Sequence, residues 1–283
     1  MKIVNDPVKA QKIIKELKLK RKSIGFVPTM GALHEGHLSL IRSSCKENDF
    51  TVVSIFVNPV QFGPKEDLNK YPRPIKNDLV LCKKAGVDLV FHPMAENIYP
   101  QGYKTWVTVD GLSKELCGKS RPVHFRGVTT VVAKLFNIIQ PDAAYFGQKD
   151  AQQAIIIEKM AQDLNFPVKI QAIPTVREKD GLALSSRNIY LNKQERQDAL
   201  VLQQVLDLAK SVIKSGERNT QKVIFLMRRF IAHKSSAKID YVEIVDYNNL
   251  LPARIISGKC LVALAVWIGK TRLIDNVIVT SNR

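Results

Sequence analysis

Two histidines, His34 and His37, lie three residues apart, so both side chains could face one bound phosphate group. They belong to a segment made up of Met30, Gly31, Ala32, Leu33, His34, Glu35, Gly36 and His37. An apolar stretch precedes this segment and apolar residues at helical spacing follow it. The pattern predicts a strand, a tight turn and a helix that opens near Gly36 or His37. The first N–H groups of a helix lack internal partners and carry partial positive charge, so the segment suits a phosphate site.

Two other hypotheses apply to the same segment. Proline, threonine and glycine after a strand also mark ordinary turns, and neighbouring histidines are often only surface polar groups. The tetrapeptide 34–37 differs by one residue from the zinc-binding pattern His-Glu-x-x-His. A zinc site is therefore the weaker of the two chemical hypotheses.

A second polar segment follows another apolar stretch and contains Asn58 and Gln61. Their side-chain amides are neutral donors and acceptors, which suits the binding of a hydroxy acid without added charge. A plain polar turn is the alternative for this segment.

Two more segments carry groups suited to phosphates. Gly147 ends an apolar stretch, the ammonium of Lys149 can meet a phosphate, and Asp150 can accept hydrogen bonds from ribose hydroxyls. Farther along, Ser185, Ser186 and Arg187 supply donors suited to a leaving pyrophosphate. An ordinary turn with solvated charges is the alternative at residues 147–150.

The elements that must position these segments alternate between strand and helix. Apolar runs predict strands at 23–28, 50–56, 87–91, 105–109, 143–146 and 168–174. Helices are predicted to start at Asp6-Pro7 and to cover 78–84, 128–139 and 151–164. This alternation is typical of an open parallel α/β sheet, in which ligands bind beyond the carboxyl ends of the strands. We therefore expect the four polar segments to form one site.

The rest of the chain has a different order of elements. A long helix is predicted over 193–214, starting at a capping box of Asn192 and Glu195, and a second helix runs from a Thr220 cap to about His233. Strands follow at 239–245, 261–267 and 273–279, and Gly269-Lys270 predicts a hairpin between the last two. Helices followed by strands indicate a separate α+β domain.

Composition limits the function classes. Lys and Arg number 43 against 26 Asp and Glu, a net charge of +17 that suits an anionic partner. A basic RNA-binding module is one hypothesis, but no basic run alternates with aromatic residues, so a base-stacking groove is poorly supported. No stretch is long and apolar enough for a membrane span, and the N-terminus lacks an apolar signal core, so we expect a cytoplasmic protein. The four scattered cysteines predict reduced thiols, mostly in the core.

The ten residues 28–37 resemble the signature of the pantoate–β-alanine ligase family, and their last four fit the HIGH-type element of the nucleotidyl-transferase superfamily. The resemblance is dense from Ile24 to Asn188. It continues in 56–62 with 67–68 and 71–73, in 124–127, in 146–150 with 152–153, and in 184–188. Leu184 replaces the methionine of the family, a swap that nearly conserves volume.

This resemblance implies an α/β fold with two domains. Residues 1–175 would form a Rossmann-like open parallel sheet that binds nucleotide and pantoate. Residues 176–283 would form a smaller α+β domain that covers the ATP site. The implied reaction is the ATP-dependent condensation of pantoate with β-alanine to pantothenate, through a pantoyl adenylate, with release of AMP and pyrophosphate. The implied partners are these small molecules and a second copy in a homodimer, without nucleic acid or membrane.

The resemblance also implies the residues of the site. Those assigned to ATP are Met30, Gly31, Ala32, Leu33, His34, Glu35, Gly36, His37, Gly147, Gln148, Lys149, Asp150, Val176, Leu184, Ser185, Ser186 and Arg187. Those assigned to pantoate and β-alanine are Gln61, Asn58, Gln153 and Met30. The catalytic set is His37, His34, Lys149, Ser185, Ser186 and Arg187, which would hold phosphate charge, with His37 as a proton donor.

Magnesium is expected to bind mainly through the ATP phosphates. Some family members place paired aspartates where this chain has Asn77-Asp78, so only Asp78 offers a carboxylate and its metal role is doubtful. A different adenylyl-transferring enzyme of the superfamily stays a rival hypothesis. The amides of Gln61 and Gln153 discriminate, because a phosphorylated acceptor would favour Arg or Lys at these positions.

Overall fold

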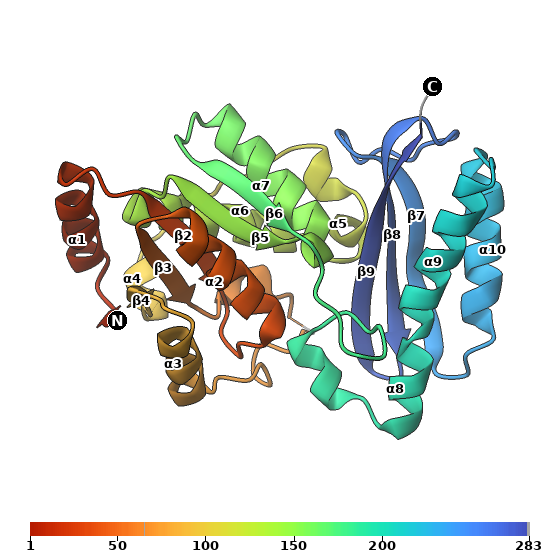
Figure 1. Ribbon diagram of the computed structural model, residues 1–283, viewed down its shortest axis with the longest axis horizontal. Coiled ribbons are helices and arrows are strands. Elements are labelled where there is room, and N and C mark those ends of the chain that lie inside the picture. Colours follow the sequence, from red (N-terminus) through yellow and green to blue (C-terminus); the bar gives the residue numbers. More distant parts are fainter. Residues whose placement is uncertain (65, 282–283) are drawn as a thin grey trace. The chain divides into compact units, whose positions relative to one another are not determined.

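The computed structural model describes residues 1–64 and 66–281 (Figure 1). The chain divides into two compact units. Unit 1 comprises Met1–Ser113, Arg121–Gln148 and Gln153–Pro174, and unit 2 comprises Lys114–Ser120, Lys149–Gln152 and Thr175–Arg283. The domains 1–175 and 176–283 stay a prediction.

Unit 1 is built on a six-stranded sheet in the order β1-β4-β3-β2-β5-β6, and every pairing in it is parallel. Its strands are β1 (Lys2–Val4), β2 (Ile24–Thr29), β3 (Phe50–Ile55), β4 (Leu89–Phe91), β5 (Ala143–Gly147) and β6 (Lys169–Ile173). This confirms the expected open parallel α/β sheet. The edge strand β1 has no counterpart in the sequence prediction, because three residues are too few to show a period.

The strand order places a topological switch point at β2. From β2 the chain adds β3 and β4 toward one edge, and later adds β5 and β6 toward the other. Connections that leave in opposite directions open a crevice beyond the carboxyl ends of such strands, which is where open α/β sheets bind ligands. The segment 30–37 follows β2, and Gly147 ends β5.

Helices cover both faces of this sheet. The helices of the α/β part are α1 (Pro7–Leu19), α2 (Glu35–Glu47), α3 (Ile75–Lys84), α4 (Ala95–Ile98), α6 (His124–Ile139) and α7 (Ala151–Asp163). Val27 of β2 packs in one cluster with residues of α2 and α3. The next residue back, Phe26, points to the opposite face and meets Phe136 of α6. The sheet is thus buried on both sides, which explains its nearly continuous apolar strands.

The strand predicted at Thr105–Val109 is wrong, because this stretch belongs to no strand or sheet. At its centre, both backbone groups of Val107 bond to side chains of α6. Val107 N–H donates to Thr130 Oγ1 at 3.0 Å, and Thr129 Oγ1 donates to Val107 O at 2.7 Å. Hydroxyls of a helix therefore replace the partner strand.

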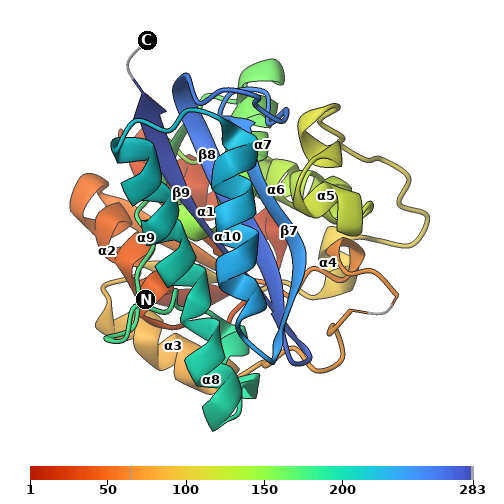
Figure 2. The same ribbon diagram turned by 90° about the vertical axis from the view of Figure 1, so that its right-hand side faces the viewer.

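Unit 2 contains an antiparallel sheet in the order β7-β8-β9. Its elements are α5 (Cys117–Ser120), α8 (Lys193–Ala199), α9 (Val201–Lys214), α10 (Thr220–Ala232), β7 (Ala237–Asp246), β8 (Gly258–Ile268) and β9 (Thr271–Ser281). Figure 2 shows α9 and α10 side by side against this sheet, and their apolar residues join those of the strands in one core. The predicted strands and the hairpin at Gly269-Lys270 are confirmed.

Two details of the helices differ from the sequence prediction. The long helix expected over 193–214 is two helices, because Leu200 N–H bonds Gln197 O, three residues back, and interrupts the α-helical ladder. The cap of α10 is Asn219, whose side chain accepts from the N–H groups of Gln221 and Lys222. The Thr220 hydroxyl instead donates to Ala253 O at 2.6 Å.

The described part of the chain holds no helix with the length and apolarity that a membrane crossing needs. The four cysteines are free thiols, and all but Cys45 are buried.

Candidate active site

The turn after β2 is held by a buried carboxylate. Asp78, which is 1% exposed in the first turn of α3, accepts the N–H of Ala32 at 2.9 Å and that of Leu33 at 2.8 Å. Gly31 has φ +79°, and a Cβ there would lie 2.9 Å from Asp78 Oδ2, so glycine is required. Ala32 adopts φ +51°, a conformation that costs free energy and persists only where surrounding contacts impose it. The two hydrogen bonds to Asp78 supply that constraint.

His34 and His37 stand at the N-terminus of α2 and are oriented through their Nδ1 atoms. His34 Nδ1 accepts from Gly36 N–H at 3.2 Å, and His37 Nδ1 accepts from His34 N–H at 3.3 Å. The ring centroids lie 4.1 Å apart. An imidazole that accepts at Nδ1 is neutral and carries its proton on Nε2. Each ring therefore has an Nε2–H donor fixed by the start of the helix.

Asn58 and Gln61 form a buried amide pair after β3. Asn58 is 1% exposed, and its Nδ2 donates to Gln61 Oε1 and to Gly127 O, both at 3.0 Å. Gln61 Nε2 lies 3.1 Å from Met30 Sδ. Because Gln61 Oε1 accepts from Asn58, the other end of the Gln61 amide is a donor in a defined orientation. Asn58 thus fixes the amide of Gln61.

Tyr99 completes this arrangement from the C-terminal end of α4. Its hydroxyl donates to Asn58 Oδ1 at 2.9 Å, so the Asn58 amide is bonded on both sides. Burial raises the pKa of Tyr99 far above its ordinary value, and the hydroxyl stays protonated and able to donate. The Tyr99 ring packs edge-on against Tyr103 at 5.1 Å and stacks on Trp106 at 6.5 Å. Tyr99 is not among the residues predicted from the sequence, because its partner lies 41 residues earlier.

Helix α6 approaches the amide pair through Gly127. A Cβ at this position would lie 2.6 Å from Gln61 Cα and 2.6 Å from Val60 O, closer than atoms can pack. His124, one turn earlier, lies with Nδ1 3.0 Å from Gln61 O. Through these two contacts the stretch 124–127 packs directly against the segment that contains Asn58 and Gln61.

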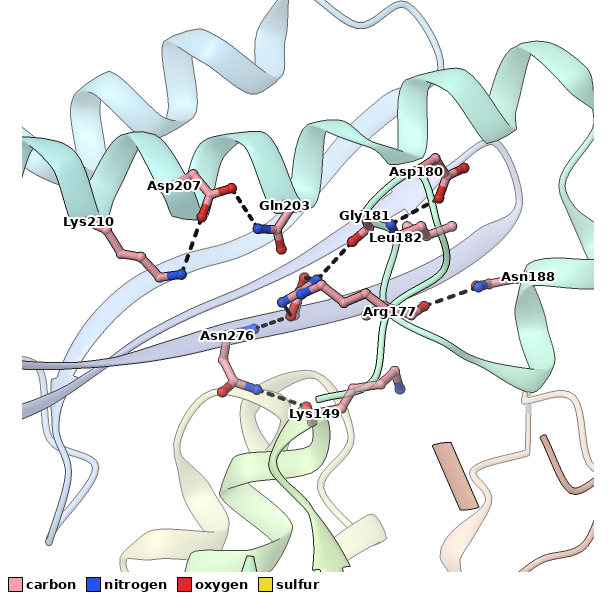
Figure 3. A network of polar contacts seen from close by, with 12 residues as sticks. Lys149, Arg177, Asp180, Gly181, Leu182, Asn188, Gln203, Asp207, Lys210 and Asn276 are labelled. Atoms are coloured by element: carbon pink, nitrogen blue, oxygen red, sulfur yellow. Dashed lines mark hydrogen bonds and ion pairs between the residues drawn. The ribbon is translucent and has the colours of Figure 1, made fainter. Parts of the chain in front are cut away.

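Lys149, two residues after the end of β5, belongs to unit 2 (Figure 3). Its main-chain carbonyl accepts from Asn276 Nδ2 of β9 at 2.9 Å. Its ammonium lies 3.9 Å from Asp150 Oδ2, which is a loose ion pair. The backbone of Lys149 is therefore fixed more firmly than its side-chain nitrogen.

The segment that leads to Ser185 is a small hairpin in unit 2. Leu184 N–H donates to Val176 O at 3.0 Å, and Arg177 forms an antiparallel bridge with Ala183. Ser185 Oγ then accepts from Arg187 N–H at 3.3 Å, at the start of the 3₁₀ turn Ser186–Tyr190. The predicted donors Ser185, Ser186 and Arg187 thus follow a hydrogen-bonded hairpin.

Arg196 of α8 braces the same hairpin. Its guanidinium donates two hydrogen bonds of 2.8 Å to the Glu178 carboxylate and a further one of 2.6 Å to Asp180. Asn188 Nδ2 donates to Glu178 Oε1 at 2.9 Å. The hydrogen bonds from Arg196, against the opposing effect of burial, lower the pKa of Glu178 below its ordinary value.

Comparison with known proteins decides the family. The family model described as Pantoate-beta-alanine ligase matches residues 2–278. The chain belongs to this family. It is 58% identical over 260 residues to the pantothenate synthetase of Moorella thermoacetica, covering 92% of each chain. It is 55% identical to that of Pseudothermotoga lettingae, covering 98% of this chain and 99% of the relative.

Solved structures of ligases from this family agree in fold. The pantothenate synthetase of Thermus thermophilus superposes with a TM-score of 0.93 at 42% identity, over 98% of this chain and 99% of that one. The pantoate-beta-alanine ligase of Francisella tularensis gives a TM-score of 0.80 at 35% identity, over 98% and 97% of the two chains. That structure is described as complexed with β,γ-ATP and β-alanine. The activity of the chain is the ATP-dependent condensation of pantoate and β-alanine, which selects the ligase from the hypotheses that the sequence left open.

The ligase residues predicted from the sequence fall into two groups. In unit 1 lie the segment 30–37, the amides of Asn58, Gln61 and Gln153, and the end of β5 with Gly147 and Gln148. In unit 2 lie Lys149, Asp150, Val176, Leu184, Ser185, Ser186 and Arg187. Within each unit the structure brings several of these residues close, as described above. That both groups form one site stays a prediction.

In this ligase, Asp78 holds the turn at Ala32 and Leu33. Both of its oxygens accept backbone N–H groups, and it is almost wholly buried. Among the described residues, 1–64 and 66–281, no group of three or more His, Cys, Asp or Glu side chains is arranged to hold a metal ion.

Proposed function

We propose that the chain makes pantothenate in two half-reactions. In the first, a pantoate carboxylate oxygen attacks the α-phosphorus of ATP, the bond to the β-phosphate oxygen breaks, and pyrophosphate leaves. In the second, the amine of β-alanine attacks the acyl carbon of the pantoyl adenylate, AMP leaves with the bond electrons, and the ammonium proton is released. Both nucleophiles come from substrates, so the protein contributes positioning and charge stabilisation.

The observation that carries this proposal is the pair of oriented imidazoles at the switch point of the sheet. His34 and His37 each accept a backbone N–H at Nδ1, so each directs an Nε2–H donor from the N-terminus of α2. Helix dipole and donors together favour a phosphate there. Through Nε2–H the neutral ring of His37 donates a hydrogen bond to a phosphate oxygen. To act as a proton donor, the role that the family resemblance implies, the ring would first take up a proton at Nδ1. We assign residues 30–37, Gly147 and Gln148 to ATP from unit 1.

Unit 2 contributes the remaining charge to the same triphosphate in this proposal. The β- and γ-phosphates bind to one ammonium, two hydroxyls and one guanidinium, which also stabilise the leaving pyrophosphate. These groups belong to Lys149, Ser185, Ser186 and Arg187. Asp150 accepts from the ribose, while Val176 and Leu184 line the base and phosphate side. The α+β domain, residues 176–283, would thereby cover the ATP site.

The acid site is proposed at Gln61 and Gln153, with Met30 beside them. The burial of Gln61 and the fixed direction of its Nε2 support a contact with the pantoate oxygens. Asn58 contributes by fixing Gln61, since both ends of its amide are bonded within the protein. The amine of β-alanine enters beside Gln61 in the second step.

Magnesium is proposed to arrive with ATP and to bind mainly through its phosphates. The burial of Asp78 and its hydrogen bonds to two backbone N–H groups support this, because residues 77–78 then offer no exposed carboxylate to the ion. The ion would neutralise phosphate charge during adenylation. A homodimer and a cytoplasmic location complete the proposal by analogy with the family.

The test is formation of AMP from ATP in the presence of pantoate and β-alanine. We expect AMP and pantothenate in equal amounts, with neither formed when one substrate is left out. With ATP and pantoate but no β-alanine, one equivalent of pyrophosphate should appear per active site, because the adenylate stays bound. AMP that forms at the same rate without pantoate would contradict the proposal.

A further inference from the structure

Strand β9 carries two buried polar residues, Asp275 and Asn276, within an apolar run. They are 2% and 7% exposed, while Leu273, Val277 and Val279 of the same strand pack in the core of unit 2. Burying a carboxylate or an amide costs free energy unless hydrogen bonds replace those to water. The partners of this pair therefore indicate what the two residues do.

Asp275 holds the hairpin that precedes Ser185. Arg177 donates to both carboxylate oxygens of Asp275, at 2.7 and 3.0 Å, in a bidentate ion pair. The same guanidinium donates to Gly181 O at 3.1 Å, so it ties the tip of the hairpin to its base. A paired, buried carboxylate of this kind constrains geometry strongly. Asp275 thus fixes where the chain enters the segment 185–187.

Asn276 holds Lys149. Its Nδ2 donates to the Lys149 carbonyl at 2.9 Å, across 127 residues of sequence. Successive side chains of a strand point to opposite faces, so neighbouring residues of β9 can reach two different segments. Figure 3 shows Asn276 directed to Lys149 and the Arg177 side chain meeting the strand nearby.

We infer that Asp275 and Asn276 are positioning residues for the adenylation step. They set the spacing between Lys149 and the segment 185–187, so that one ammonium, two hydroxyls and one guanidinium meet the same chain of phosphates. Two adjacent residues of one sheet strand provide a stiffer frame than two separate loops. This inference rests on the proposed function, because it requires Lys149 and residues 185–187 to contact ATP.

The test is a double-mutant cycle on the rate of pyrophosphate release, measured by rapid quench with saturating pantoate. Asn276→Ala should slow release by about tenfold to a hundredfold, the scale for a misplaced catalytic group. If Asn276 acts through Lys149, the same substitution should change the rate less than about twofold in a Lys149→Ala background. Equal fold-losses in both backgrounds would overturn the inference.

Asp275→Asn is the second variant, combined in the same way with Arg187→Ala. It keeps the size of the side chain but weakens the pairing with Arg177, and we expect its effect to shrink strongly when Arg187 is absent. The second half-reaction, started by adding β-alanine to the preformed adenylate, should change less than about threefold in either variant. A general folding defect would slow both half-reactions alike and would contradict a positioning role.

Asp198→Asn is the matched control. Asp198 is also a buried carboxylate of unit 2, at 4% exposure, and accepts from Ser236 N–H and Oγ. It should lower the melting temperature without changing pyrophosphate release. A failure of the proposed function can be told apart from a failure of the positioning role alone. If the proposed function is wrong, Lys149→Ala and Arg187→Ala will release pyrophosphate at the wild-type rate. That result would overturn the positioning role as well.

Discussion

The Asp78 carboxylate accepts the backbone N–H of Leu33 at 2.8 Å, although 45 residues separate the two along the chain. Its second oxygen accepts from Ala32 N–H, so one buried side chain of α3 shapes the turn that leads to His34 and His37. From the sequence, Asp78 is a doubtful magnesium ligand. The contacts indicate instead that it acts on the turn.

Asp78→Asn should therefore slow adenylation without changing the magnesium requirement. The amide places a donor against one of two N–H groups, which costs about 1–3 kcal/mol and disturbs the turn. We expect pyrophosphate release to fall at least about tenfold, with an unchanged half-saturating Mg²⁺ concentration. Asp88→Asn is the control, since Asp88 accepts Thr51 N–H at 2.8 Å at the start of β3. A large rise in the Mg²⁺ needed would identify Asp78 as a metal ligand.

Tyr99→Phe should weaken pantoate binding. The change removes the hydroxyl that donates to Asn58 Oδ1 but keeps the ring in its aromatic cluster. Leaving this buried acceptor unpaired frees the Asn58 amide to turn and releases Gln61, so KM for pantoate should rise about tenfold. Steady-state kinetics with varied pantoate measures the effect, and KM for ATP should stay near its original value. Tyr103→Phe, in the same cluster, should leave both constants unchanged.

His37→Ala and Lys149→Ala should each reduce the adenylation rate by about a hundredfold or more, the scale for loss of one preorganised donor. The measurement is single-turnover pyrophosphate release by quench. The controls are His233→Ala, at the end of α10, and Lys210→Ala, whose ammonium pairs with Asp207 on α9. Rates close to those of the wild type in both test variants would remove these residues from the mechanism.

Gly127→Ala should damage both stability and pantoate binding. The added methyl group would meet Gln61 Cα and Val60 O at 2.6 Å, so either α6 or the amide segment must move. Overpacking of this kind costs about 1–3 kcal/mol, visible as a lower midpoint in urea unfolding. Gly63→Ala is the control, because its Cβ would meet Glu66 no closer than 3.7 Å. An unchanged midpoint for Gly127→Ala would show that the close approach is easily relieved.

Acid should weaken the brace between Glu178 and Arg196. The pKa of Glu178 is lowered by hydrogen bonds from Arg196, in opposition to burial, from an ordinary value of 4.5. A lowered folded-state pKa means that the stabilisation is complete above the unfolded value and is lost as pH falls through the folded value. We expect the melting temperatures of wild type and Glu178→Gln to differ at about pH 6 and to converge as pH falls below about 4.5. A constant difference down to about pH 3 would contradict this linkage.

Local signals in the sequence determined most of the fold. Asp6 caps α1, Asn192 and Glu195 form their predicted capping box, and the apolar runs at 24–29, 50–55 and 143–147 are parallel strands. Each of these signals depends on residues within a few positions of one another. The signature at 28–37 also sufficed to identify the family, because its residues are consecutive.

Tertiary structure alone decided how the candidate site is supported. Asp78 with Leu33, Tyr99 with Asn58, and Asn276 with Lys149 are pairs separated by 45, 41 and 127 residues. No periodicity or cap connects such residues, because chain topology brings them together only after the sheets form. The wrong strand prediction at 105–109 has the same cause. The backbone of Val107 bonds to hydroxyls of Thr129 and Thr130 in α6, and not to a neighbouring strand. The sequence specifies which groups are available, and long-range packing specifies which of them meet.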